Sequence, residues 1–334
     1  MRLIPLIIAV ALAVALEAGE VAAAPDVTTP ALAINAEAVL LLDREGRVLY
    51  AKNPAISHAP ASLVKLMTLY LAFEDLEAGR AQWDEPVEVS RHAAETPRYR
   101  MGLRAGETVP LSTLLEGVAI ASANDAAAAV AEHLGPGEDR FVDRMNLKAK
   151  ELSLARTRFA NPHGLPDPGQ RTTAVDMAQL IGQLVEDYPA SRTILGGKAF
   201  IYRGRVYGRR IPLFEDPGGV QALKTGFTNE AGYNLAIAAW RDGHSFLLIV
   251  LGCQTRSHSF RDAKKLLQLG FGEPVIERKP DPRRPPVRVR KPPPKRQRAR
   301  VQTAGHRRFQ GERACLAPGR SSSTRTAPSS TCTR

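Results

Sequence analysis

A serine and a lysine lie three residues apart in the segment ASLVKLMT, immediately before an apolar run. If a helix begins at or near Ser62, the side chains of Ser62 and Lys65 lie on one face, one turn apart. The lysine amine could then take the hydroxyl proton and make the serine a nucleophile. It can do so only if burial or a nearby cation lowers its pKa. The pair therefore predicts nucleophilic catalysis in a closed, electropositive pocket.

Two further short motifs carry related chemistry. Ser122-Ala123-Asn124 holds a hydroxyl and an amide, and Lys224-Thr225-Gly226 brings a second amine. The apolar pattern predicts the first motif in a turn between two helices and the second at the end of a strand. Each motif is weak by itself. Their order and settings are those of β-lactamases and penicillin-binding proteins.

Longer segments extend this resemblance over about residues 35–272. The stretches ASLVKLMT, SANDAAAAVAEH, FANPHGL with GQRTTAVDMAQL, and LKTGFTNEAGYNLAIAA resemble the D-alanyl-D-alanine carboxypeptidases, low-molecular-mass serine penicillin-binding proteins that trim peptidoglycan. The resemblance implies a serine D,D-carboxypeptidase that removes the terminal D-alanine from stem pentapeptides through an acyl-enzyme. It also implies acylation by β-lactams and chemistry that needs no metal or cofactor.

The resemblance gives three residues a catalytic role. Ser62 attacks the carbonyl of the penultimate D-alanine, Lys65 accepts the proton of Ser62, and Ser122 relays a proton to the leaving D-alanine. The backbone N–H groups of Ser62 and Phe227 form the oxyanion hole, where each donor contributes on the order of 3 kcal/mol.

The remaining site residues are expected to bind substrate. Asn124 holds Lys65 and the substrate amide, and Lys224 attracts the terminal carboxylate while its charge lowers the pKa of Lys65. Thr225 binds that carboxylate, and Gly226 and Phe227 complete the strand beside it.

The sequence departs from the family pattern at several positions. Phe227 stands where a polar residue is frequent, Ala123 where glycine is common, and Gln221-Ala222 where Asp-Gly is usual. The resemblance also implies a carboxylate-binding arginine late in the chain, for which Arg256 and Arg261 are both candidates.

Apolar periodicity predicts the elements that position these residues. A hairpin over 39–50 precedes a helix from 62 to about 76 and a short strand at 87–89. Helices are expected at 111–120, 124–134, 138–152, 173–185 and 261–269, and strands at 199–202, 205–207, 221–226, 233–240 and 245–252. This order predicts an α+β, β-lactamase/transpeptidase-like fold: an antiparallel sheet built from both chain ends and flanked by helices, an all-helical lobe, and an active site in the cleft between.

The two ends of the 334-residue chain read differently from its middle. Residues 1–24 resemble a secretory signal peptide, with Arg2, an apolar run over 3–16 and small residues before Ala24. An uncleaved anchor is the alternative, and either one places the protein outside the cytoplasm, in the periplasm or an equivalent compartment. The catalytic domain is expected over 25–276.

Residues 277–334 form a basic, proline-rich tail that cannot build a core. They hold 17 of the 46 Lys and Arg residues but 3 of the 34 Asp and Glu residues. The net charge of +12 therefore belongs to the tail, which argues against a nucleic-acid partner for the folded part. The tail either contacts anionic membrane or wall surfaces or is a solvated linker. The small β-rich domain and amphipathic membrane helix of many relatives are not recognisable in it.

Alternative functions use the same residues. A D,D-endopeptidase would cut peptidoglycan cross-links with this machinery. A β-lactamase would need a carboxylate to activate the deacylating water, and no E-x-x-x-N loop is convincing. A non-catalytic penicillin-binding scaffold would not need the intact Ser62, Lys65 and Lys224. His163, in N-P-H-G-L, is either a catalytic helper or, as we favour, a loop histidine bonded to backbone.

Overall fold

The computed structural model describes residues 32–97 and 99–275. They belong to a unit of the chain that spans Met1–Arg278. The predicted signal peptide (1–24) and basic tail (277–334) lie outside the described residues and stay predictions. Within the described ranges, every helix is too short or too polar to cross a bilayer.

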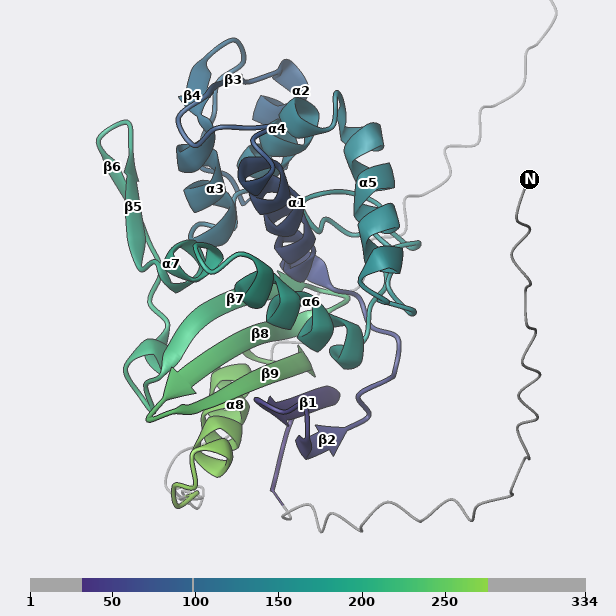
Figure 1. The fold of residues 1–334 in the computed structure, drawn as a ribbon, viewed down its shortest axis with the longest axis vertical. Coiled ribbons are helices and arrows are strands. Elements are labelled where there is room, and N and C mark those ends of the chain that lie inside the picture. The colour runs from purple at the N-terminus through teal and green to yellow at the C-terminus, as the bar shows by residue number, and fades with distance from the viewer. Residues whose placement is uncertain (1–31, 98, 276–334) are drawn as a thin grey trace, which may run out of the picture. The chain divides into compact units, whose positions relative to one another are not determined.

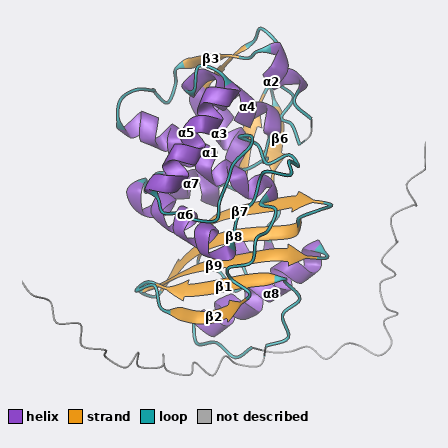
Figure 2. Cartoon of the chain, turned by 90° about the vertical axis from the view of Figure 1, so that its right-hand side faces the viewer, coloured by secondary structure: helices purple, strands orange, loops and turns teal. Residues whose placement is uncertain are grey.

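A five-stranded antiparallel sheet joins the two ends of the described chain (Figures 1 and 2). Its spatial order is β2-β1-β9-β8-β7, so the first hairpin pairs with the last, and β7 forms an edge. The strands are β1 Ala38–Asp43, β2 Val48–Lys52, β7 Val220–Thr228, β8 Gly232–Arg241 and β9 His244–Cys253. The prediction of one sheet built from both ends of the chain is confirmed.

Helices cover both faces of this sheet. Leu40 and Ile249 belong to the core on the side of α6 (Ala174–Asp187), whereas Leu41 and Leu248 belong to the core under α8 (Arg256–Gly270). Figure 2 shows the helices of the lobe on one side of the strands and α8 on the other. Because both faces are buried, β1 and β9 are continuous apolar runs rather than alternating ones.

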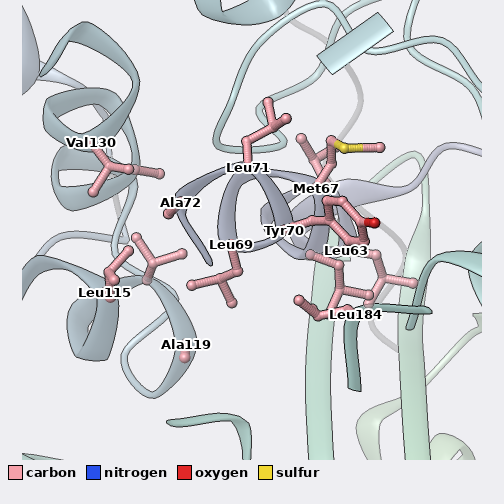
Figure 3. Packing of buried hydrophobic residues seen from close by; sticks show 14 of the residues in the cluster. Leu63, Met67, Leu69, Tyr70, Leu71, Ala72, Leu115, Ala119, Val130 and Leu184 are labelled. Carbon is pink, nitrogen blue, oxygen red and sulfur yellow. The ribbon is translucent and has the colours of Figure 1, made fainter. Parts of the chain in front are cut away.

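The helical lobe is organised around α1 (Lys65–Glu77), whose first nine residues are all buried. A helix that is apolar on every side must be surrounded by other elements. Figure 3 shows Leu115 and Val130 on one side of α1 and Leu184 on another. The surrounding helices include α3 Leu111–Ala119, α4 Asn124–Leu134 and α5 Glu138–Glu151, besides α6. All four longer helices predicted after residue 100 in the lobe are therefore confirmed.

Several short elements were not predicted. They are α2 Arg91–Glu95, α7 Ser191–Gly196 and β4 Thr108–Pro110, which pairs with β3 Pro86–Glu88. Segments of three to six residues contain too few positions to show a period.

Three boundaries and the placement of one hairpin add to the expected arrangement. The helix predicted from Ser62 begins at Lys65, after a 3-10 turn over Ala61–Val64. β7 continues two residues beyond the glycine predicted to end it. α8 begins earlier than predicted because the Thr255 side chain caps it. Strands β5 (Ala199–Tyr202) and β6 (Arg205–Gly208) form a separate hairpin instead of joining the main sheet.

Candidate active site

The Nζ atom of Lys65 lies among three oxygen atoms from separate parts of the chain. It is 3.2 Å from Ser62 Oγ and 2.7 Å from Asn124 Oδ1, and it also hydrogen-bonds the carbonyl oxygen of His163. These groups come from the 3-10 turn, the start of α4 and the 161–169 loop. The structure thus brings three of the predicted site residues into direct contact.

This arrangement suits a neutral lysine. A neutral amine has two hydrogens and one lone pair, and carbonyl oxygens only accept hydrogen bonds. Asn124 Oδ1 and His163 O can take both hydrogens, which leaves the lone pair for the Ser62 hydroxyl. Lys65 is 0% exposed, and burial lowers its pKa to about 7 against the opposing effect of the Asp125 carboxylate. Burial, more than a neighbouring cation, is therefore what favours the neutral amine.

The second amine belongs to Lys224 on β7. Its Nζ lies 2.8 Å from Ser122 Oγ and 3.0 Å from the carbonyl oxygen of Thr225. The pKa of Lys224 is lowered well below its usual value, first by burial and then by the charges of Lys65 and Arg209. The positive charge of Arg209 thus acts on Lys224, and an electropositive environment of this kind suits a carboxylate.

Two glycines let β7 and the 161–169 loop close on the serine. A Cβ atom on Gly226 would lie 3.1 Å from Ser62 N, and one on Gly164 would lie 2.1 Å from the carbonyl oxygen of Ala61. Gly164 also has a φ of +84°, in the left-handed region that favours glycine. Strand and loop therefore pack directly against the turn that carries the nucleophile.

The turn between α3 and α4 holds the middle motif. Ser122 has a φ of 54°, and Asn124 Nδ2 donates to the Pro97 carbonyl at 2.9 Å, which turns Oδ1 toward Lys65. The next residue, Asp125, is completely buried. Its carboxylate accepts hydrogen bonds from the N–H groups of Met101, Gly102 and Leu103. This carboxylate thus holds the segment beside the turn in place.

The 161–169 loop has its own internal bonds. Gly164 N donates to Asn161 Oδ1 at 2.7 Å, and Leu165 N donates to His163 Nδ1 at 3.2 Å. The interpretation of His163 as a loop histidine bonded to backbone is confirmed, and its carbonyl proves to be the group that meets Lys65.

Asn234 supports the site although no motif marked it. Its Nδ2 donates to the carbonyls of Ala59 at 3.0 Å and Pro60 at 3.2 Å, and its Oδ1 accepts from Gly252 N at 2.9 Å. It thus ties the segment before Ser62 to the sheet. An amide inside the apolar run of β8 was the available signal.

Arg209 is the other functional residue that sequence reasoning missed. Its guanidinium donates to the carbonyls of Gly197 at 2.8 Å and Leu223 at 2.9 Å, and also to that of Leu195. Burial lowers its pKa to about 10. It joins α7 to β7 and places positive charge beside Lys224, but a single arginine after a strand gives no sequence signal.

Some predicted residues lie at the margin of this cluster. Thr225 is half-buried, next to Lys224 on the edge strand. The Phe227 ring is 38% exposed and stacks on Tyr233, with ring centroids 4.3 Å apart. A backbone role for Phe227 is compatible with this position, because its ring packs against the neighbouring strand.

The two candidate carboxylate-binding arginines both lie on α8. Arg256 donates to the Arg210 carbonyl at 3.1 Å, and Arg261 is exposed. Within the described residues, neither contacts Ser62 or Lys65. Neither of them is therefore assigned as the carboxylate-binding arginine, whereas the charge of Arg209 does act on Lys224.

Cavity size does not mark the site. A cavity of about 530 Å³ in the described part of the chain has Trp240 in its wall, at the other end of β8. A pocket of about 10 Å³ lies beside the nucleophile, where Ala61, Gly164 and Thr228 contribute to its wall. The hydrogen bonds of Lys65 and Lys224, rather than cavity volume, therefore locate the site.

Comparisons with known proteins agree with this fold. The sequence matches the family described as D-alanyl-D-alanine carboxypeptidase over residues 23–255. It is 36% identical over 258 residues to the D-alanyl-D-alanine carboxypeptidase DacF of Bacillus subtilis, a match that covers 73% of this chain and 64% of that protein. The chain thus spans a little under two thirds of the length of that curated relative.

Solved structures of penicillin-binding proteins have a similar fold. Penicillin-binding protein 5 of Haemophilus influenzae is 33% identical, with a TM-score of 0.69 and coverage of 72% of this chain and 71% of that one. Penicillin-binding protein D2 of Listeria monocytogenes, solved in an ampicillin-bound form, is 29% identical, with a TM-score of 0.64 and coverage of 72% and 99%. Fold and site define the β-lactamase/transpeptidase-like class of serine penicillin-binding proteins. Within that class, the chain belongs to the D-alanyl-D-alanine carboxypeptidase family.

Proposed function

We propose that this protein is a serine D,D-carboxypeptidase that removes the terminal D-alanine from peptidoglycan stem pentapeptides. The observation that carries the proposal is the placement of Lys65 Nζ between the Ser62 hydroxyl and two fixed acceptors, Asn124 Oδ1 and His163 O. Family membership supports the substrate, since relatives with the same fold carry this activity in their names.

The acylation step uses the neutral amine of Lys65. As Ser62 Oγ bonds to the carbonyl carbon of the penultimate D-alanine, its proton passes to the Lys65 lone pair. The carbonyl oxygen becomes an oxyanion, which the backbone N–H groups of Ser62 and Phe227 stabilise. Each such donor contributes on the order of 3 kcal/mol.

The departing D-alanine needs a proton on its nitrogen and a site for its carboxylate. Ser122, hydrogen-bonded to Lys224 at 2.8 Å, supplies a proton path to the nitrogen. Lys224 and Thr225 bind the carboxylate, and Arg209 adds positive charge that acts on Lys224. Water then attacks the acyl-enzyme, releases the shortened peptide and regenerates Ser62. A β-lactam would acylate the same serine, because its ring amide occupies the place of the peptide bond.

The location of the enzyme follows from the predicted chain ends. We infer that residues 1–24 direct export, that 25–276 form the catalytic domain outside the cytoplasm, and that the tail 277–334 is either a linker or a contact to envelope polyanions. Deleting 277–334 and measuring envelope retention at several salt concentrations tests the tail. Unchanged retention would exclude the contact.

The decisive experiment combines two substrates. The purified protein is incubated with a fluorescent penicillin and, separately, with a peptide that ends in D-Ala-D-Ala. We expect covalent label that is lost in Ser62→Ala, together with D-alanine release. Label without release from the linear peptide, but with cleavage of cross-linked dimers, would favour the D,D-endopeptidase. Rapid turnover of the penicillin would instead indicate a β-lactamase.

A further inference from the structure

Lys65 depends on the carbonyl of His163 as its second fixed acceptor. If this carbonyl moves, one N–H group of the neutral amine loses its partner, and the lone pair is no longer held toward Ser62. The hydrogen bond between Lys65 and His163 O is buried. The groups that fix His163 therefore bear directly on the base.

The imidazole of His163 is neutral and its tautomer is defined. Burial, together with the nearby charges of Lys65 and His92, lowers its pKa to about 3. Its Nδ1 accepts a hydrogen bond from Leu165 N at 3.2 Å. In a neutral ring the other nitrogen then carries the hydrogen, so Nε2–H needs an acceptor.

Glu138, the first residue of α5, faces that nitrogen. Its Oε1 lies 3.8 Å from His163 Nε2, and its Oε2 is buried with no hydrogen-bond partner in the part of the chain described. The imidazole and the carboxylate therefore face one another, and a buried carboxylate oxygen with no hydrogen-bond partner is rare in folded proteins. Since an N–H···O bond spans about 2.9 Å, a shift of about 1 Å joins the two groups.

We propose that Glu138 is a positioning residue for the base: its carboxylate receives the Nε2 hydrogen of His163 and so holds the His163 carbonyl against Lys65. The inference rests on the proposed function, because it matters only if Lys65 is the base. Glu138 contacts neither Ser62 nor the substrate site, and it acts through His163.

The charged groups around Glu138 come from several elements. His92 on α2 lies 3.9 Å from Oε2 and is itself bonded to Glu132 on α4 at 2.8 Å. Burial raises the pKa of Glu138, the charges of Glu132 and Asp139 act in the same direction, and the charge of His92 opposes them. A protonated Glu138 could donate instead of accept. The contact between Glu138 and His163 therefore strengthens as pH rises. The neutral fraction of Lys65 rises with pH as well.

The test compares two substitutions at one position. Glu138→Gln keeps an acceptor oxygen, whereas Glu138→Ala removes it. The measured quantity is the rate constant for acylation by a fluorescent penicillin from pH 5 to pH 9, with D-alanine release as a second readout. We expect Glu138→Ala to lower the plateau about tenfold and Glu138→Gln to stay within about twofold of the wild type.

The pH at which the acylation rate constant begins to fall, the acid limb of the profile, distinguishes a positioning role of Glu138 from a general loss of structure. Losing an acceptor harms the three-hydrogen ammonium more than the two-hydrogen amine, so in Glu138→Ala the limb moves to lower pH. A substitution that only loosened the lobe would leave the limb where it is. Glu132→Gln is the matched control, because Glu132 bonds His92 but does not approach His163, and it should leave plateau and limb unchanged.

A double-mutant cycle with His163→Ala completes the test. If Glu138 acts through His163, Glu138→Ala has no further effect in that background. A wild-type limb in Glu138→Ala, or an undiminished tenfold loss in His163→Ala, would overturn the inference. If Glu138→Ala does not fold, Glu138→Asp, which withdraws the acceptor by one methylene, is measured instead and should show the same shift. Absence of acylation in the wild type would refute the proposed function itself, which is a separate result.

Discussion

The Nζ atom of Lys224 lies 2.8 Å from the Oγ atom of Ser122, although 102 positions separate the two residues in sequence. This bond crosses from the edge strand of the sheet to the turn between two helices of the lobe. It makes the site a property of the interface between the two parts, so anything that moves the lobe against the sheet should change catalysis.

The acylation rate should follow the deprotonation of Lys65. Because burial lowers the pKa of this amine to about 7, the neutral fraction falls with pH below that value. The rate constant for acylation by penicillin should therefore fall about tenfold per pH unit below the pKa and be level above it. Lys65→Arg, whose guanidinium stays protonated, should lose at least about a thousandfold at every pH. A flat profile between pH 5 and pH 8 would contradict the role of Lys65.

Lys65→Met should abolish catalytic activity and raise the free energy of unfolding by an amount that depends on pH. The wild-type amine has a pKa of about 7 when folded, against a usual value of 10.5, so the unfolded chain binds the extra proton. The buried amine therefore lowers the free energy of unfolding of the wild type. This loss of stability is fully present below pH 7 and disappears as pH rises toward 10.5. The difference in free energy of unfolding, variant minus wild type, should thus shrink by about 2–3 kcal/mol between pH 6 and pH 9. Chemical denaturation at both pH values measures it, and a constant difference would argue against the buried amine.

Gly164→Ala should damage both fold and catalysis. The new Cβ would lie 2.1 Å from the carbonyl oxygen of Ala61, at a φ of +84°. We expect a loss of about 2–4 kcal/mol in the free energy of unfolding and at least about a hundredfold loss in acylation, because the turn with Ser62 must move. Gly169→Ala, in the same loop but without a positive φ, is the control and should cost under about 1 kcal/mol. Equal effects of the two substitutions would show that the contact with Ala61 is unimportant.

Arg209→Met should weaken substrate capture more than the chemical step. It removes a positive charge that acts near Lys224 and leaves the carbonyls of Leu195, Gly197 and Leu223 without their donor. We expect KM for a D-Ala-D-Ala peptide to rise about fivefold or more, with a smaller change in kcat and a loss of about 2 kcal/mol in stability. Arg209→Lys keeps the positive charge but cannot donate to all three carbonyls at once. It should therefore bring KM closer to the wild-type value than it brings the free energy of unfolding. Recovery of stability alone would contradict the electrostatic role.

The sequence predicted the parts of the site that local patterns encode. Ser62 and Lys65 share one face because their spacing is set within a single turn, and this holds even though the helix begins three residues later than expected. The contact between Ser122 and Lys224 joins distant segments, and the sequence indicated it only through the resemblance to a family. Asn234 and Arg209 were missed because each acts through backbone carbonyls, which any sequence supplies and no motif records.

The cause of the lowered lysine pKa was only partly predicted. The sequence suggested that the charge of Lys224 would lower the pKa of Lys65, but the structure attributes the change to complete burial. It is the pKa of Lys224 that is lowered by repulsion, from the charges of Lys65 and Arg209. Burial of Lys65 follows from its place at the start of a helix enclosed by the whole lobe, and that enclosure cannot be read from residues 61–68 alone.

The pairing of β1 with β9 has a consequence for how the protein matures. Ala38 lies opposite Leu251, and Ala36 N is bonded to Asp262 at a separation of 226 residues. Contacts of such range are late and slow to form. A nascent chain must therefore carry β1 and β2 as an unpaired hairpin with an open edge until the last strand has been synthesised. A polypeptide stopped short of residue 244 would keep that edge exposed, and strand edges of this kind invite aggregation.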